Sequence, residues 1–299
     1  MKKLLAILCC VIILVLSTGN AFAANASGSP GIAKYFDGQE ITMLANKSFC
    51  QMNSYVITTK NGGVIVVDGG TEYDAANLAK TILTKGGHVN AWFITHPHND
   101  HAGALTKLLT DGLWKYGITI DAVYLNLFDQ GVYNYYEPDR AAFVQQLRDA
   151  LAPLGNLVHS VHRNDFYAVD DVIVQVMNDP YVNPNRFINN SSVVYRMFIA
   201  DKRVTFLGDL CEDTGMQFLA DHAGEDLTTD FVQMAHHGSY GVNFQFYQML
   251  LPKVCMWNSP SWLYNDTSGN FQSAQVKEWM KMLGVTEHYS IANGNQVIR

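Results

Sequence analysis

The segment Thr95-His96-Pro97-His98-Asn99-Asp100-His101-Ala102-Gly103 constrains this chain more than any other. It places three imidazoles and one carboxylate within six residues. Histidine is the commonest side-chain ligand of metal ions, and the order H-x-H-x-D-H supplies two alternating ligands followed by two adjacent ones. The segment therefore predicts two cations that lie side by side. A polar surface loop, which is the alternative, gives no reason for three histidines at this spacing.

The N-terminus has the features of a secretory signal peptide. Met1-Lys2-Lys3 precedes an apolar run from Leu4 to Leu16, and Ala21-Phe22-Ala23 fits the small-x-small cleavage rule. Because the apolar run is too short for a comfortable membrane span, we expect cleavage after Ala23 rather than an uncleaved anchor. The mature protein, residues 24–299, would then be secreted or held at the cell surface, with no membrane segment of its own.

The charge of the chain gives no support for nucleic acid as a partner. The full sequence has 20 basic and 27 acidic residues, and removal of residues 1–23 takes away Lys2 and Lys3, which leaves 18 against 27 and a net charge of −9. A protein that grips a nucleic-acid backbone needs a basic face. The balance therefore argues against a long polyanion as the partner.

Three cysteines remain after cleavage, at Cys50, Cys211 and Cys255. An odd and widely spaced set cannot form a disulfide framework. One disulfide with a free thiol and three buried thiols are both compatible with export. We favour buried thiols because Cys211 and Cys255 lie beside apolar runs.

Short apolar strands alternate with turn residues and helices along residues 24–299, and no linker or repeat follows Gly31. Residues 61–63 predict a hairpin turn between strands at 55–58 and 64–67. Asp74 can cap a helix over 75–84, and a buried strand at 91–95 then delivers the histidines to a strand-to-helix loop. Strands and helices without strict βαβ alternation predict one domain of α+β (α/β) class, with two sheets covered by helices.

Polar residues also follow other expected strands. The segments are Val66-Val67-Asp68-Gly69-Gly70, Phe206-Leu207-Gly208-Asp209 and Met234-Ala235-His236-His237-Gly238-Ser239. Loops at the C-terminal ends of strands converge while the strands hold them rigidly. The sequence therefore predicts one site that is assembled from distant segments.

In this order and spacing, D-G-G, T-H-x-H-x-D-H-x-G, G-D and H-H-G-S resemble the metallo-β-lactamase superfamily. Asn189-Asn190-Ser191-Ser192-Val193-Val194, together with the G-D and H-H-G-S segments, is similar to the branch that contains ComEC-type competence domains and phosphorylcholine esterases. Asn293-Gly294 before Val297-Ile298 resembles the closing strand of that branch. The resemblance covers nearly all of the mature chain and implies a four-layer αββα sandwich with a binuclear metal site at one edge.

The resemblance also implies a set of metal ligands. His96 and His98 would bind the first metal, Asp100 and His101 the second, Asp209 would bridge both, and His236 would complete the second site. His236 is preferred to His237 because the ligand in related motifs closes the strand, and His237 would then line the substrate pocket. Two divalent ions are expected, with Zn²⁺ first, although Mn²⁺ or iron fits almost as well. Asp68 would orient a histidine ligand.

Two departures from the family pattern bear on the substrate. The usual third histidine of the first metal is absent, since His159 and His162 precede the relevant strand and the expected loop contains Asn189-Asn190. These two asparagines form either an ordinary turn or a pair of amides that donate to an oxyanion or ligate weakly. The ComEC-type proteins also carry a later Tyr-Gly-His-Pro-like segment, whereas residues 258–266 contain no histidine, which weakens a nuclease assignment.

The sequence thus predicts an exported metal-dependent hydrolase in which a metal-bound hydroxide attacks an ester centre. Asp100, Asn190 and His237 are the candidate catalytic residues, with Asn190 and His237 stabilising developing charge. The resemblance ranks phosphoesters and phosphodiesters first, and lactones and lactams second. The alternative from another class is a non-catalytic surface module that has lost one metal, and the absent third histidine motivates it.

Overall fold

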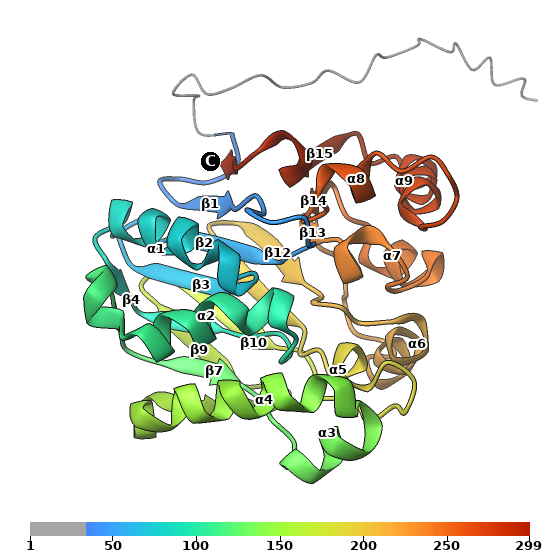
Figure 1. Ribbon diagram of the computed structural model, residues 1–299. Helices are drawn as coiled ribbons and strands as arrows, with labels where there is room; N and C mark the ends of the chain where they lie inside the picture. Colours follow the sequence, from blue (N-terminus) through green and yellow to red (C-terminus); the bar gives the residue numbers. More distant parts are fainter. Residues whose placement is uncertain (1–33) are drawn as a thin grey trace, which may run out of the picture. The chain divides into compact units, whose positions relative to one another are not determined.

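Two seven-stranded sheets lie at the centre of residues 34–299, the part of the chain that this computed structural model describes (Figure 1). The first sheet has the strand order β16 (Gln296–Ile298), β1 (Glu40–Met43), β2 (Ser54–Thr58), β3 (Val64–Asp68), β5 (Ala91–Phe93), β7 (Val123–Leu125), β8 (Val158–Ser160). The second has the order β15 (Glu287–Ser290), β14 (Val254–Trp257), β13 (Phe231–Gln233), β12 (Lys202–Phe206), β11 (Tyr195–Ile199), β10 (Val172–Val176), β9 (Phe166–Val169). Two short strands, β4 (His88–Val89) and β6 (Thr119–Ile120), pair separately.

Each sheet is antiparallel on one side and parallel on the other. Strands β16, β1, β2 and β3 pair in antiparallel fashion, and β3, β5, β7 and β8 are parallel. The second sheet repeats this arrangement, with β9 to β12 antiparallel and β12 to β15 parallel. The carboxyl ends of the parallel strands in each sheet meet at one edge, and loops at such an edge are held by a rigid frame.

The core between the sheets follows the alternation of side chains along each strand. In β3, Ile65 and Val67 lie between the two sheets, whereas Val64 and Val66 pack under the helices. Since successive side chains of a strand point to opposite faces, a strand that is covered on both faces reads as a continuous apolar run. The run from Val64 to Val67 is thus explained by burial on both sides.

Helices cover the outer faces of the sheets. The first sheet is covered by α1 (Ala75–Thr84), α2 (Asn99–Asp111) and α4 (Pro138–Leu151), and the second by α6 (Glu212–Asp221), α7 (Phe244–Leu250) and α9 (Ser273–Met282). Three shorter helices lie in connections, namely α3 (Gln130–Tyr136), α5 (Phe187–Asn190) and α8 (Ser261–Tyr264). The predicted four-layer αββα sandwich is therefore confirmed.

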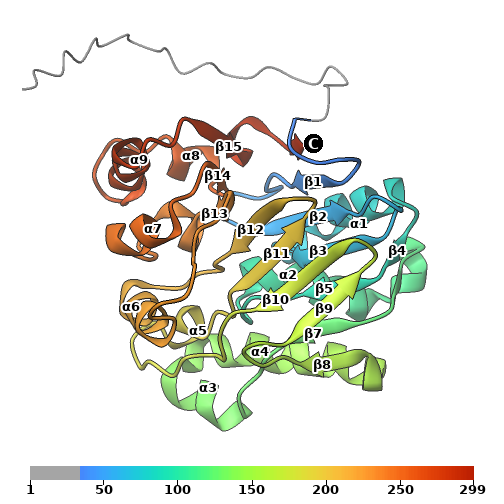
Figure 2. The ribbon, with the colours of Figure 1, turned by 180° about the vertical axis from the view of Figure 1, so that it is seen from behind.

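The covering of the second sheet is uneven. The helices pack against its parallel half, and the outer face of β9 and β10 stays open (Figure 2). In β10, Val172 and Val174 are buried against the first sheet while Ile173 between them is 45% exposed. An antiparallel half-sheet can face water on one side, and the alternation in this strand reflects that.

The expected signal peptide, residues 1–23, lies outside the described residues. Within residues 34–299, no helix combines the length and the apolar character that a membrane crossing requires.

Candidate metal centre

Seven candidate polar side chains meet at one edge of the two sheets. The loop after β5 and the first turn of α2 carry His96, His98, Asp100 and His101, Asp209 follows β12, and His236 and His237 follow β13. Pro97 lacks a backbone N–H and has a fixed φ, which suits the break between β5 and α2. Asp100 lies in the first turn of α2, where a carboxylate is favoured by the helix dipole.

Gly208 allows the second segment to approach the first. Its φ is +57°, and a Cβ at this position would lie 2.9 Å from Ser192 Oγ and from Thr95 Cβ. Only glycine adopts this conformation at this distance without displacing its neighbours. The loop that carries Asp209 therefore passes directly over Thr95, the residue before His96.

The side chains form two groups that share one residue. Asp100, His101, Asp209 and His237 each offer one ligand atom, and these atoms lie within 4.8 Å of one another. His96, His98 and Asp209 form the second group by the same measure. Asp209 belongs to both groups, as expected for a carboxylate that bridges two ions.

Atoms that face one another in this cluster lack the hydrogen-bond partners that burial normally demands. Asp68 Oδ2 lies 2.8 Å from His101 Nδ1, and since a carboxylate accepts, Nδ1 carries a proton, and in the neutral ring Nε2 presents a lone pair. That Nε2 lies 3.1 Å from Asp209 Oδ1, and both atoms are buried without a hydrogen bond. His237 Nε2 is likewise buried without a partner. Unpaired buried acceptors are costly, so this donor set fits a divalent cation.

The charges of the cluster favour the same conclusion. Burial lowers the pKa of His101, but Asp209 and Asp68 outweigh it and raise that pKa well above its usual value. Burial raises the pKa of Asp209, but His101, His237 and His236 hold it well below its usual range. Burial, reinforced by the charge on His101, lowers the pKa of His96. Without a metal ion, His101 therefore favours the protonated form between Asp68 and Asp209. A divalent cation held by Asp209 and His101 would take the place of the Nε2 proton, because metal ligands bind in their deprotonated forms.

Asp68 fixes the orientation of His101. Besides His101, it accepts hydrogen bonds from the Thr95 main-chain N–H at 2.8 Å and from Asn53 Nδ2 at 2.6 Å. Its backbone has a φ of +55°, in the left-handed region that Asp and Asn tolerate best among residues with a side chain. Asp68 therefore orients a candidate ligand through a hydrogen bond, which is the role expected from the sequence.

Replacement of Asp68 by asparagine will weaken metal binding without unfolding the protein. The amide keeps the size and tolerates the backbone angle, but it cannot accept from His101 with a full negative charge, so we expect about a 10- to 100-fold loss of metal affinity. A zinc titration against a competing indicator measures this. Asp170→Asn is the matched control, because Asp170 has a similar φ of +49° far from the cluster. Unchanged affinity in Asp68→Asn would contradict the assigned role.

Glu137 supports His98 and was not predicted from the sequence. Its Oε2 lies 3.6 Å from His98 Nε2, while its Oε1 accepts from the Ile188 main-chain N–H at 3.0 Å. His98 Nδ1 in turn lies 3.2 Å from His96 Nε2. In the sequence, Glu137-Pro138 is typical only of the start of a helix, and no local pattern connects that helix with the histidine loop.

His236 and His237 take places opposite to those expected. His237 Nε2 lies 3.3 Å from Asp100 Oδ2 and 3.6 Å from Asp209 Oδ2, whereas His236 belongs to neither group and lines the pocket. The expectation assumed that the strand continues to His236. Instead both histidines have left-handed backbones, with φ values of +50° and +57°, and Gly238 follows at +77°. This tight turn brings the second histidine to both carboxylates, whereas His236 Nε2 faces only Asp209, with 3.8 Å to Oδ2.

Asn190 also differs from its expected role, because its side chain does not reach the pocket. Its Nδ2 donates to the Asn185 carbonyl at 2.6 Å, and its Oδ1 accepts from the Cys211 main-chain N–H at 3.3 Å and from the Thr214 hydroxyl. Asn190 thus ties α5 to the start of α6. Asn189 faces the pocket instead, and its Nδ2 lies 3.2 Å from His236 Nε2.

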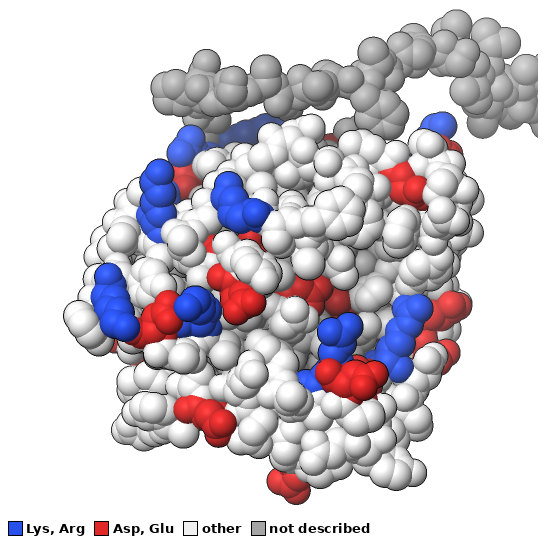
Figure 3. All heavy atoms as spheres, in the orientation of Figure 1, with Lys and Arg blue, Asp and Glu red and all other residues white. Residues whose placement is uncertain are grey.

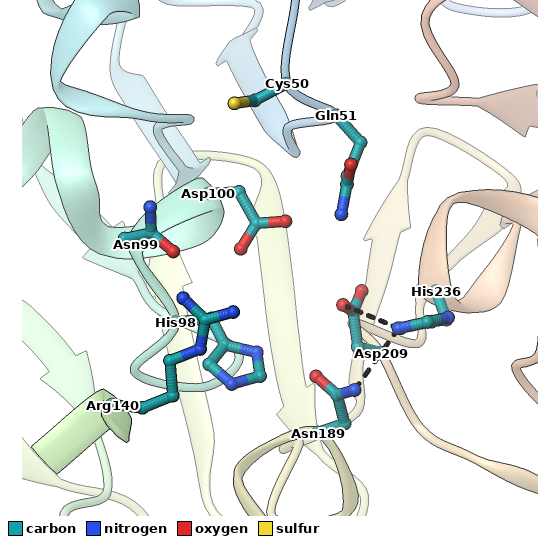
Figure 4. Close-up of a pocket in the computed structure, with 9 residues that line it drawn as sticks. All are labelled: Cys50, Gln51, His98, Asn99, Asp100, Arg140, Asn189, Asp209 and His236. Carbon is teal, nitrogen blue, oxygen red and sulfur yellow. Dashed lines mark hydrogen bonds and ion pairs between the residues drawn. The ribbon is translucent and has the colours of Figure 1, made fainter. Parts of the chain in front are cut away.

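A pocket of about 290 Å³ opens over the cluster (Figure 4). It is lined by Cys50, Gln51, His98, Asn99, Asp100, Arg140, Asn189, Asp209 and His236. Acidic side chains lie in a hollow near the centre of the face drawn in Figure 3, with basic side chains beside it. All three cysteines of the described chain are free, and Cys211 and Cys255 are buried while Cys50 is exposed. Sequence reasoning did not bring Cys50, Gln51 or Arg140 to this site.

Comparisons with known proteins identify a family and a shared fold. A family model described as the metallo-beta-lactamase superfamily matches residues 48–245. No curated protein sequence matches the chain. The fold is similar to that of the metallo-beta-lactamase fold protein YhfI from Bacillus subtilis, with a TM-score of 0.53 and 10% identity over 87% of this chain and 99% of that one.

The fold is also similar to that of CmlA, a diiron beta-hydroxylase from Streptomyces venezuelae. The TM-score is 0.55 with 11% identity over 88% of this chain, which spans 54% of CmlA. Identities this low show a shared fold and no more. The finer resemblance to the ComEC-type and phosphorylcholine-esterase branch stays a prediction.

Proposed function

The chain belongs to the metallo-beta-lactamase superfamily, and from this premise we propose that it is an exported metal-dependent hydrolase of phosphoesters or phosphodiesters. One observation carries the proposal. Two groups of buried ligand atoms share Asp209, and several of these atoms have no hydrogen-bond partner in the described chain. Such an arrangement fits two adjacent divalent cations, with zinc the first choice for nitrogen and carboxylate ligands.

The residues divide into those that would hold the cations and those that face the substrate. His96, His98 and Asp209 would hold one ion, and Asp100, His101, Asp209 and His237 the other. When bound, such ions lower the pKa of water and polarise a substrate oxygen. His236 and Asn189 stand on the pocket wall beside Asp209, joined by their own hydrogen bond (Figure 4). They would orient the substrate rather than bind metal.

The character of the pocket supports a phosphoester over a lactone or a lactam. Its walls carry the amides of Gln51, Asn99 and Asn189 and the guanidinium of Arg140, and no large apolar side chain lines it. Amide and guanidinium groups donate hydrogen bonds to oxyanions. A phosphoryl group presents more oxyanion character to such walls than a carbonyl does.

Export is proposed from the N-terminal sequence. Lys2 and Lys3 precede the apolar run, and Ala21-Phe22-Ala23 supplies the cleavage pattern. An exported enzyme of this kind would act on a small-molecule or cell-surface ester.

A metal and substrate assay tests the proposed function. Protein purified without chelator should contain two equivalents of metal by atomic spectroscopy, hydrolyse a bis-aryl phosphate or a phosphocholine ester, lose activity on chelation and regain it with Zn²⁺ or Mn²⁺. A lactone and a lactam complete the panel. Turnover of these two without phosphodiesterase activity would overturn the substrate assignment. Less than one metal equivalent and no turnover would favour a non-catalytic module.

A further inference from the structure

Arg140 is a cation at the pocket whose position neither metal group explains. It lies in the first turn of α4 and lines the pocket together with His98, Asn99 and Asp100. Figure 4 shows its guanidinium beside His98 and directed into the space that Asp100 and Asn189 also face. The side chain comes from a helix that contributes no candidate ligand, so its place in the pocket calls for a separate reason.

Arg140 differs from every other arginine between residues 34 and 299 in having no partner for its guanidinium. The other arginines each donate to a carboxylate or a carbonyl, namely Arg148, Arg163, Arg186, Arg196, Arg203 and Arg299. Glu137, the residue before α4, is engaged by the Ile188 main-chain N–H and lies against His98. The Arg140 guanidinium is therefore available to a ligand.

We propose that Arg140 binds an anionic oxygen of the substrate and thereby selects anionic esters over neutral ones. A guanidinium presents a planar fork of donors that matches a phosphoryl or carboxylate group in bidentate fashion. The amides of Asn99 and Asn189 flank the same space and can donate to further oxygens. Because Asp100 and Asp209 also face the pocket, an anion needs a compensating cation there, and Arg140 supplies one that does not depend on the metal groups.

This inference deepens the proposed function and makes a separate claim. Arg140 is a specificity residue and not a metal ligand, so its loss should change anion affinity and leave the metal content unchanged. Its effect should appear in the binding of an anion that undergoes no reaction. Inorganic phosphate is such a probe.

The test measures phosphate binding to the full-length, metal-loaded protein by titration calorimetry. Arg140→Ala should raise the Kd for inorganic phosphate roughly 10- to 100-fold, the usual range for one charge-assisted hydrogen-bonded contact. Arg140→Lys should recover part of the affinity, because an ammonium keeps the charge and loses the fork. Lys80→Ala is the matched control, since it removes one exposed positive charge on α1 away from the pocket. Acetate in place of phosphate distinguishes a carboxylate site from a phosphoryl site.

A pair of substrates extends the test to turnover. For Arg140→Ala, kcat/KM should fall for an aryl phosphodiester and stay constant for a neutral aryl acetate. Equal losses on both substrates, unchanged phosphate affinity, loss of metal from the variant, or a wild-type protein that binds neither phosphate nor acetate would each overturn the inference. If the wild type cleaves only lactones while phosphate or acetate binding still depends on Arg140, the proposed phosphoesterase function fails and the anion site stands.

Discussion

Replacement of Asp209 by alanine will remove both metal ions and lower hydrolytic activity by far more than about 100-fold. A 100-fold loss of metal affinity or activity is about the most that removal of a residue hydrogen-bonded to a ligand usually causes. Asp209 is itself a candidate ligand, and it belongs to both groups, so its removal should cost more. Its Oδ1 lies 3.1 Å from His101 Nε2, and its Oδ2 lies 3.8 Å from His96 Nε2 and 3.6 Å from His237 Nε2. The other five side chains would then keep Asp100 as their only carboxylate, and no residue would belong to both groups.

The measurement combines metal content by atomic spectroscopy with kcat/KM on the best substrate of the panel. Asp213→Ala is the matched control, because Asp213 is an exposed aspartate in the first turn of α6, a short distance along the chain. Circular dichroism of both variants establishes that they are folded. An Asp209→Ala protein that keeps two metal equivalents and its activity would show that the carboxylate does not bridge the groups.

The sequence predicted the fold correctly where buried apolar residues recur at a regular spacing between turn residues. The helix expected over 75–84 coincides with α1, and the hairpin expected around 61–63 joins β2 and β3. Residues 120–125 form a largely apolar run that predicts one strand, whereas the structure divides it into β6 and β7. The chain changes partner there, since the Asp121 N–H donates to the Val89 carbonyl while the Ala122 carbonyl accepts from the Trp92 N–H. An apolar run does not reveal such a change of partner.

The convergence of the site was also predictable, because its segments all follow strands that end at one edge. Asp209 considered alone is typical of a turn. It became a candidate ligand because it follows a strand, as the histidine segments do. Choices between adjacent residues were not predictable. Asn189 and Asn190 are consecutive residues of α5, so their side chains leave the helix in different directions. His236 and His237 both have left-handed backbones, which are set by the turn as a whole.

Some site residues lie outside any recognisable motif, and their place at the site could not be predicted for a different reason. Gln51 comes from the loop before β2, and Arg140 and Glu137 come from the start of α4. Nothing in their local sequence distinguishes them from surface residues, because their meaning lies in contacts with segments distant in the chain. Arg140, one of these residues, is the one on which substrate choice depends under the proposal.

Alanine at His237 and alanine at His236 will have different effects, and the contrast tests the tight turn that follows β13. His237→Ala should lower the metal content from two equivalents toward one and reduce kcat/KM by at least about 100-fold, since a ligand of the second group is lost. His237 Nε2 faces two carboxylates, and its ring is held by Nδ1, which lies 3.1 Å from the main-chain oxygen of Asn258.

His236→Ala should keep both metal ions and change kcat/KM by about tenfold, the usual scale for one lost hydrogen-bonded contact. Its ring lies on the pocket wall, where Nδ1 donates to the Ser239 carbonyl and Nε2 accepts from Asn189 Nδ2. Each variant is the control for the other, because the two side chains are identical and adjacent. Loss of metal from His236→Ala with retention in His237→Ala would restore the order expected from the sequence, with His236, whose Nε2 lies 3.8 Å from Asp209 Oδ2, as the ligand.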